Sequence, residues 1–164
     1  MDAIELLRDE LHRSLHGPAW HGPALLEALD DVSPAEALER PLPGAHTIAE
    51  LALHALAWIE EVTRRVAGAD DAEPARGDWP PVPELDSPLW TGIKGDLAGA
   101  GAMLDSLLST LPAARLDERP KRAGQDAPAP DAIRYAAVLH GLSQHNAYHG
   151  GQISMLKRSL RQPA

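Results

Sequence analysis

Two histidines spaced one helical turn apart are the residues of this chain best suited to chemistry. His145 and His149 stand in the stretch His145-Asn-Ala-Tyr-His149-Gly-Gly-Gln152 and fill a gap in a stripe of apolar residues at helical spacing. That stripe consists of Val138, Leu142, Ile153, Leu156 and Leu160. Burial of an unpaired polar group costs about 1–3 kcal/mol, so inward imidazoles need partners. A shared divalent metal ion would satisfy both, and so would polar protein groups in an ordinary core.

A second pair with the same spacing, His12 and His16, shows that spacing alone is weak support for a metal site. The helix expected over residues 2–15 carries its apolar stripe at Ile4, Leu7, Leu11 and Leu15. His12 falls on the opposite, polar side of that helix. The inward direction of His145 and His149 is what separates the two pairs.

Composition favours one helical domain over residues 1–164. A chain of this length can bury a core, and 44% of its residues are hydrophobic. The chain has no Phe and only 4% aromatic residues, so Leu, Ala, Val and Ile must build the core. The lack of Cys excludes a disulfide framework, a thiolate zinc site and a cysteine nucleophile. Any bound metal must therefore use His, Asp, Glu, backbone or water.

Charge and hydropathy predict which partners the protein lacks and where it is located. A net charge of −9 argues against a nucleic-acid partner, which clustered Lys and Arg would be needed to bind. Uncharged apolar runs fall short of the roughly 20 residues that span a bilayer. The first residues lack the basic and apolar regions of a signal peptide. We expect a cytoplasmic protein without a membrane partner.

Periodicity and helix signals predict an all-α fold, a four-helix bundle with long crossover loops. The long helices are expected over about 2–15, 47–67, 87–111 and 131–160, with short ones at 25–29 and after the capping box Ser33-Pro-Ala-Glu36. A second capping box, Thr47-Ile-Ala-Glu50, opens the second long helix, and Ser87-Pro88 is expected to cap the third. The Pro-rich stretches 70–86 and 112–130 are expected to be irregular.

His54 is the natural third member of a metal site. It lies beside the core stripe of the second long helix, between Leu51 and Trp58, and can lean inward. Taken alone, such a residue is more often a helix histidine with a protein partner than a metal ligand, and His54 gains weight only beside His145 and His149. Three neutral histidines would leave coordination positions open, the pattern of a catalytic rather than a structural site, and they suit zinc, nickel and neighbouring metals. His-Glu-x-x-His is absent, since Asn146 follows His145.

Other residues near these histidines have two interpretations each. Glu50 and Glu61 lie on a face of the helix similar to that of His54. Each either supports the site as a carboxylate or base or simply faces solvent, and we assign no base. Tyr148 and Gln152 either orient a ligand or have structural roles, in which Tyr148 packs and Gln152 faces solvent. The glycines at 150 and 151 cost helix stability and predict a close approach of another helix or a ligand. Three residues either line a pocket mouth or anchor loops: Trp20, His21 and Trp90.

These motifs together resemble the DinB/YfiT-like superfamily. The resemblance rests on His145-x-x-x-His149 with Tyr148 and Gly151-Gln152-Ile153, and on an earlier His54 in the helix opened by Thr47-Ile-Ala-Glu50-Leu51. The segments Gly17-Pro-Ala-Trp-His-Gly-Pro23 and Gly77-Asp-Trp-Pro80 are also similar to recurring stretches of that group. The resemblance covers nearly the whole chain.

The resemblance implies a four-helix bundle, often a homodimer, with a divalent transition metal, zinc or nickel, on His54, His145 and His149. Members with assigned activity include transferases and isomerases that depend on a low-molecular-weight thiol, and many others are described as metal-dependent hydrolases. We therefore expect a thiol-dependent S-transferase or a hydrolase acting on a small-molecule substrate. The alternative is a non-catalytic helical dimer with a structural metal or with core histidines only.

Overall fold

The computed structural model describes residues 2–122 and 124–162, and these residues form helices and loops without a β-strand. The helices are α1 (Ala3–His16), α2 (Leu25–Leu29), α3 (Pro34–Leu38), α4 (Ile48–Val66), α5 (Ser87–Ser109), the 3₁₀ helix η1 (Ala113–Asp117) and α6 (Tyr135–Arg161). The all-α expectation is confirmed. None of the helices in the described part is both long and apolar enough to cross a membrane.

Local capping explains most helix boundaries. Capping boxes open α3 and α4, as expected, because Ser33 and Thr47 each accept a hydrogen bond from the backbone of the Glu three residues later. The cap of α5 differs from the expectation. Asp86 caps this helix by accepting from the Leu89 amide, and Ser87 is its first helical residue. A carboxylate one residue earlier supplies the acceptor that we had assigned to the serine.

The last helix begins later than expected, at Tyr135 rather than near Asp131. Residues 131–134 lie outside the helix, and the Tyr135 amide donates to the carbonyl of Glu118. Tertiary pairing with the loop after η1 therefore sets the start of α6, a signal that helical periodicity does not contain.

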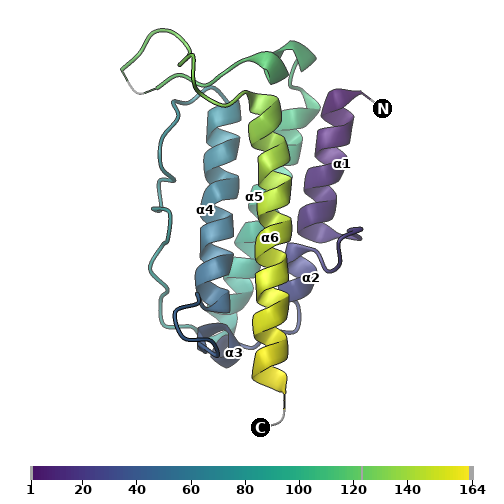
Figure 1. The fold of residues 1–164 in the computed structure, drawn as a ribbon, viewed down its shortest axis with the longest axis vertical. Helices are drawn as coiled ribbons and strands as arrows, with labels where there is room; N and C mark the ends of the chain where they lie inside the picture. The colour runs from purple at the N-terminus through teal and green to yellow at the C-terminus, as the bar shows by residue number, and fades with distance from the viewer. Residues whose placement is uncertain (1, 123, 163–164) are drawn as a thin grey trace.

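The four long helices pack as a bundle, shown in Figure 1. α1 packs against α5 and α6, and α4 packs against the same two helices. Residues 67–86 run along the outside of α4 and return the chain to the other end of the bundle, so α4 and α5 point the same way (Figure 1). This strap, residues 67–86, is the long crossover expected from the Pro-rich sequence.

The core consists mainly of leucine, isoleucine and alanine side chains, as the composition predicts. Trp90 is its largest fully buried side chain and donates its indole N–H to the carbonyl of Val32. It therefore anchors the segment between α2 and α3. Trp20, by contrast, is fully exposed.

Ion pairs hold the strap against α4. Glu61 is buried and accepts hydrogen bonds from both Arg64 and Arg65. Arg64 also donates to the carbonyl of Asp70, and Arg65 pairs with the carboxylate of Asp71 at 2.6 Å. Buried charges are tolerated when they are paired in this way.

Candidate metal centre

Three histidines from two neighbouring helices converge on one point. His54 comes from α4, and His145 and His149 come from α6, which lies beside α4. The Nε2 atom of His145 lies 3.0 Å from the Nε2 atom of His54 and 3.0 Å from that of His149. His54 and His149 are buried and His145 is partly buried. The expected inward lean of His54 is confirmed, and the three residues form a group that could hold a metal ion.

The outer nitrogen of His54 is held by the strap. Its Nδ1 lies 2.6 Å from the backbone carbonyl of Asp78, and a carbonyl only accepts, so Nδ1 carries the proton. The lone pair of Nε2 then points at the centre. The carboxylate of Asp78 lies 3.3 Å from the same Nδ1 and accepts a 2.7 Å hydrogen bond from the indole of Trp58.

His149 is oriented in the same way by a neighbour on its own helix. Its Nδ1 lies 2.7 Å from the amide oxygen of Gln152, so Nδ1 donates and Nε2 is left as an acceptor. Gln152 is therefore an orienting residue for His149, one of the two interpretations of its sequence position. Tyr148 contributes an edge-on ring contact to His149 and is 64% exposed.

The third histidine, His145, has no partner in the described part of the chain that explains its position. The Nδ1 atom of His145 is buried without a hydrogen bond, and its Nε2 faces the two acceptor nitrogens of His54 and His149. One imidazole proton cannot bridge two acceptors and leave Nδ1 satisfied. Burial, together with the neighbouring histidines, lowers the pKa of His145 to about 4, so proton sharing does not resolve the crowding near neutral pH.

The donor set fits a divalent transition metal. Burial also lowers the pKa of His149, so both α6 imidazoles are neutral in the form that binds metals. Two nitrogens bound tetrahedrally to one zinc at about 2.0–2.1 Å are about 3.3 Å apart, close to the 3.0 Å separations in this cluster. The two Nε2 acceptors fixed by their Nδ1 protons face a third Nε2 that can donate to only one of them, and this crowding agrees with an ion at the point of convergence.

An aromatic stack covers one side of the centre. The ring of Trp79 lies flat against His54, with centroids 3.9 Å apart, and His46 stacks on its other face at 3.6 Å. Trp79 is 40% exposed, so it separates His54 from solvent on this side. Sequence reasoning assigned no role to Asp78, Trp79 or His46. The only signal for the first two was their place in a stretch that recurs in the resembling family.

The two glutamates considered beside His54 have other partners. The carboxylate of Glu50 caps α4 through the Thr47 amide and pairs with Arg40. That of Glu61 is held between Arg64 and Arg65. Neither is positioned by this structure as a base for the centre.

Of the two glycines beside the histidines, Gly150 lies in van der Waals contact with another segment and Gly151 is open. A Cβ atom on Gly150 would lie 3.5 Å from the carbonyl oxygen of Pro23 and 3.7 Å from the backbone of Leu25. The close approach expected there is confirmed and comes from the start of α2. A Cβ atom on Gly151 would meet no described atom within 4 Å.

The fold and the centre define a class of protein, an all-α bundle in which two neighbouring helices bring three histidines together. A family model described as the DinB superfamily matches residues 19–153, more than half of the chain. The chain therefore belongs to the DinB superfamily, and the resemblance found in its motifs is confirmed. No curated protein and no solved structure matches the chain.

Proposed function

We propose that this protein is a metal-dependent enzyme that transfers a low-molecular-weight thiol to an electrophilic small molecule. His54, His145 and His149 would hold one divalent transition metal, zinc or nickel. The observation that carries the proposal is the convergence of three Nε2 atoms, two of them fixed as acceptors by hydrogen bonds at Nδ1 and the third able to donate to only one of those two. When bound, the ion would act as a Lewis acid that lowers the pKa of a thiol or a water molecule.

The residues around the centre support this role. Asp78 and Gln152 hold the proton of their histidine on the outer nitrogen, which keeps the inner nitrogen available as a ligand. Trp79 shields the face of His54 from water. The chain has no Cys, so the thiol must come from a cosubstrate.

Thiol transfer is favoured over hydrolysis by the position of the nearest carboxylate. A thiol starts from a pKa of about 8.5, whereas an ion must bring that of bound water from about 15.7 to about 7, so a hydrolase gains from a base beside the ion that takes a proton from water. The carboxylate of Asp78 lies on the Nδ1 side of His54, away from the point of convergence, and already accepts from Trp58. Lowering the pKa of a thiol by the ion itself needs no such base.

Metal content is the first test of the proposal. Elemental analysis of the untagged protein is expected to find about one transition-metal ion per chain, lost in the variant His145→Ala/His149→Ala. The variant His12→Ala/His16→Ala is the matched control, because it removes two histidines at the same spacing from α1 and should keep its metal. Absence of metal in the wild type, with no uptake of added zinc or nickel, would refute the proposal.

The reaction is tested on the metal-loaded protein. Consumption of chlorodinitrobenzene is expected to require an added low-molecular-weight thiol and to fall to background in the His145→Ala/His149→Ala variant. Thiol-independent cleavage of a nitrophenyl ester would instead identify a hydrolase. A structural ion predicts neither reaction, and thiols would then leave the visible spectrum of the cobalt-substituted protein unchanged.

The proposal also includes a homodimer. It is supported by Tyr148 and Met155, two large side chains that are exposed on α6, and light scattering tests it.

A further inference from the structure

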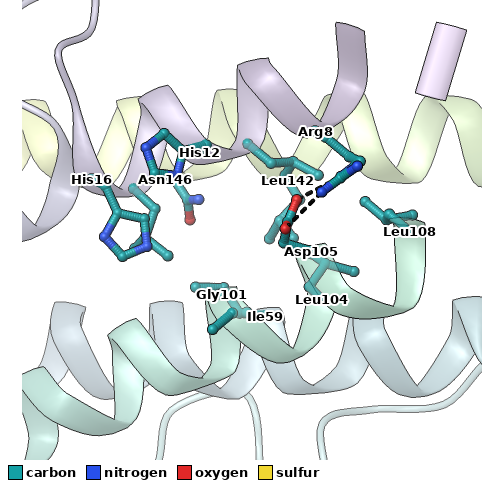
Figure 2. A pocket seen from close by; sticks show the side chains of 13 residues that line it. Arg8, His12, His16, Ile59, Gly101, Leu104, Asp105, Leu108, Leu142 and Asn146 are labelled. Carbon is teal, nitrogen blue, oxygen red and sulfur yellow. Dashed lines mark hydrogen bonds and ion pairs between the residues drawn. The ribbon is translucent and has the colours of Figure 1, made fainter. Parts of the chain in front are cut away.

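A cavity of about 230 Å³ lies between α1, α5 and α6 (Figure 2). The three histidines of the centre are not among the residues that line it. An engineered apolar cavity of about 150 Å³ binds benzene, so this cavity has room for a bicyclic molecule. Five of its thirteen lining residues are leucines: Leu11, Leu15, Leu104, Leu108 and Leu142.

The charged groups at one end of the cavity satisfy each other. Arg8 donates two hydrogen bonds to the carboxylate of Asp105, at 2.7 and 2.9 Å (Figure 2). At the other end the rings of His12 and His16 stack with centroids 4.9 Å apart. Burial lowers the pKa of His16, so that ring is neutral near pH 7. The paired Arg8 and Asp105 and the neutral His16 ring thus suit a neutral ligand with an aromatic ring.

A single buried acceptor faces this space without a donor. Asn146 is 1% exposed, and its amide nitrogen donates to the Ser14 hydroxyl at 3.2 Å. The Ser14 hydroxyl donates in turn to the carbonyl of Leu11, which leaves its oxygen only the role of acceptor and fixes the orientation of the amide. The Oδ1 atom of Asn146 has no hydrogen-bond partner among the described residues and points into the space between the helices (Figure 2).

We propose that this cavity is a second ligand site, which binds a small neutral aromatic molecule through one N–H or O–H donated to Oδ1 of Asn146. The leucines would contact the apolar body of the ligand, and the unpaired oxygen selects ligands that carry a donor. The site is independent of the metal proposed at the histidine centre, so each proposal can fail alone.

The test compares two bicyclic probes of nearly the same shape with the full chain. Indole carries an N–H donor, whereas benzofuran has an acceptor oxygen at that position. Calorimetry is expected to show indole binding about tenfold more tightly than benzofuran, the size of one added hydrogen bond. Methyl NMR spectra are expected to shift at the five cavity leucines. Absence of saturable indole binding, equal affinity for both probes, or shifts confined to other methyl groups would overturn the proposal.

The variant Asn146→Leu isolates the hydrogen bond. Leucine has nearly the same size and removes the acceptor, while the Ser14 hydroxyl keeps its bond to Leu11. Indole affinity is expected to fall about tenfold, to the level of benzofuran, which should itself change little. Retention of the preference for indole in this variant would show that Asn146 is not the acceptor. The comparison of probes on the wild-type chain stands even if the variant fails to fold.

Discussion

A neutral histidine binds a metal through one ring nitrogen while the other nitrogen carries the proton. In this centre a single neighbour of His54 and a single neighbour of His149 fix which nitrogen is which. The backbone of Asp78 fixes His54, and the side chain of Gln152 fixes His149. Partners of this kind set the tautomer and the ring orientation of a ligand. Gln152 is the more accessible to mutation, because its contribution comes from a side chain.

Replacement Gln152→Leu is expected to weaken metal binding by about 10- to 100-fold, since His149 loses the acceptor that holds its proton on Nδ1. A competition titration with a chromophoric chelator measures the change. Gln144→Leu is the matched control on the same helix, because Gln144 contacts His140 and not the centre. Equal metal affinity of the Gln152→Leu variant and the wild type would show that the observed hydrogen bond does not support the site.

The start of α2 packs against α6 at one of the two adjacent glycines of α6. Gly150 lies against the backbone of Pro23 and Leu25 at the start of α2, whereas Gly151 is exposed and open. Glycine in a helix interior costs about 1 kcal/mol relative to alanine. The cost at Gly150 is offset by close packing of α2 on α6, and no such contact offsets it at Gly151.

Substitutions at the two glycines are therefore expected to have opposite effects. Gly151→Ala should stabilise the protein by about 1 kcal/mol through helix propensity. Gly150→Leu should destabilise it by about 1–3 kcal/mol, because the longer side chain must displace the α2 backbone. Urea unfolding measures both changes. Similar effects of the two substitutions would contradict the packing seen at Gly150.

Ion pairs tie the end of α6 to the turn after α2 and to α3. Arg161 pairs with the carboxylates of Asp31 and Glu36, and Lys157 also pairs with Asp31. Hydrogen bonds from Arg161 and from Ser33 lower the pKa of Glu36 from 4.5 to about 2. Lys157 and then Arg161 lower the pKa of Asp31. Residues far apart in the chain thus close the bundle at this end.

The stability contributed by this cluster depends on pH. A carboxyl whose pKa is lowered in the folded state stabilises it above the unfolded pKa, and the contribution is lost as pH falls through the folded pKa. For Glu36 this window runs from about pH 4.5 down to about pH 2. The free energy of unfolding of the wild type is expected to fall more steeply across it than that of Arg161→Gln. The two curves should converge at the acid end.

Chemical denaturation across this pH range measures the difference. Arg158→Gln is the control, because it removes an exposed arginine from the same helix and should leave the slope as in the wild type. Parallel curves for the wild type and Arg161→Gln would show that the cluster adds no pH-dependent stability.

Local signals in the sequence determined most of the architecture. Capping residues and apolar stripes act within a few residues of themselves, so the four long helices, the short α2 and α3, and the irregular strap were all predictable. The boundaries that depended on distant partners were not. The late start of α6 follows from pairing with Glu118, which periodicity cannot encode.

The same division holds for the histidine centre. The spacing and inward direction of His145 and His149 follow from one helix. His54 was predictable as a third candidate ligand because it lies beside a core stripe. Their meeting with His54, 91 residues from His145, required α4 and α6 to pack side by side. Asp78 and Trp79 lie on the strap, which has no periodic pattern that predicts where its residues point. Only the closed bundle decided that Asp78 holds His54 and that Trp79 covers it, because those contacts join segments that meet through tertiary packing alone, whereas Gln152 reaches His149 within one helix.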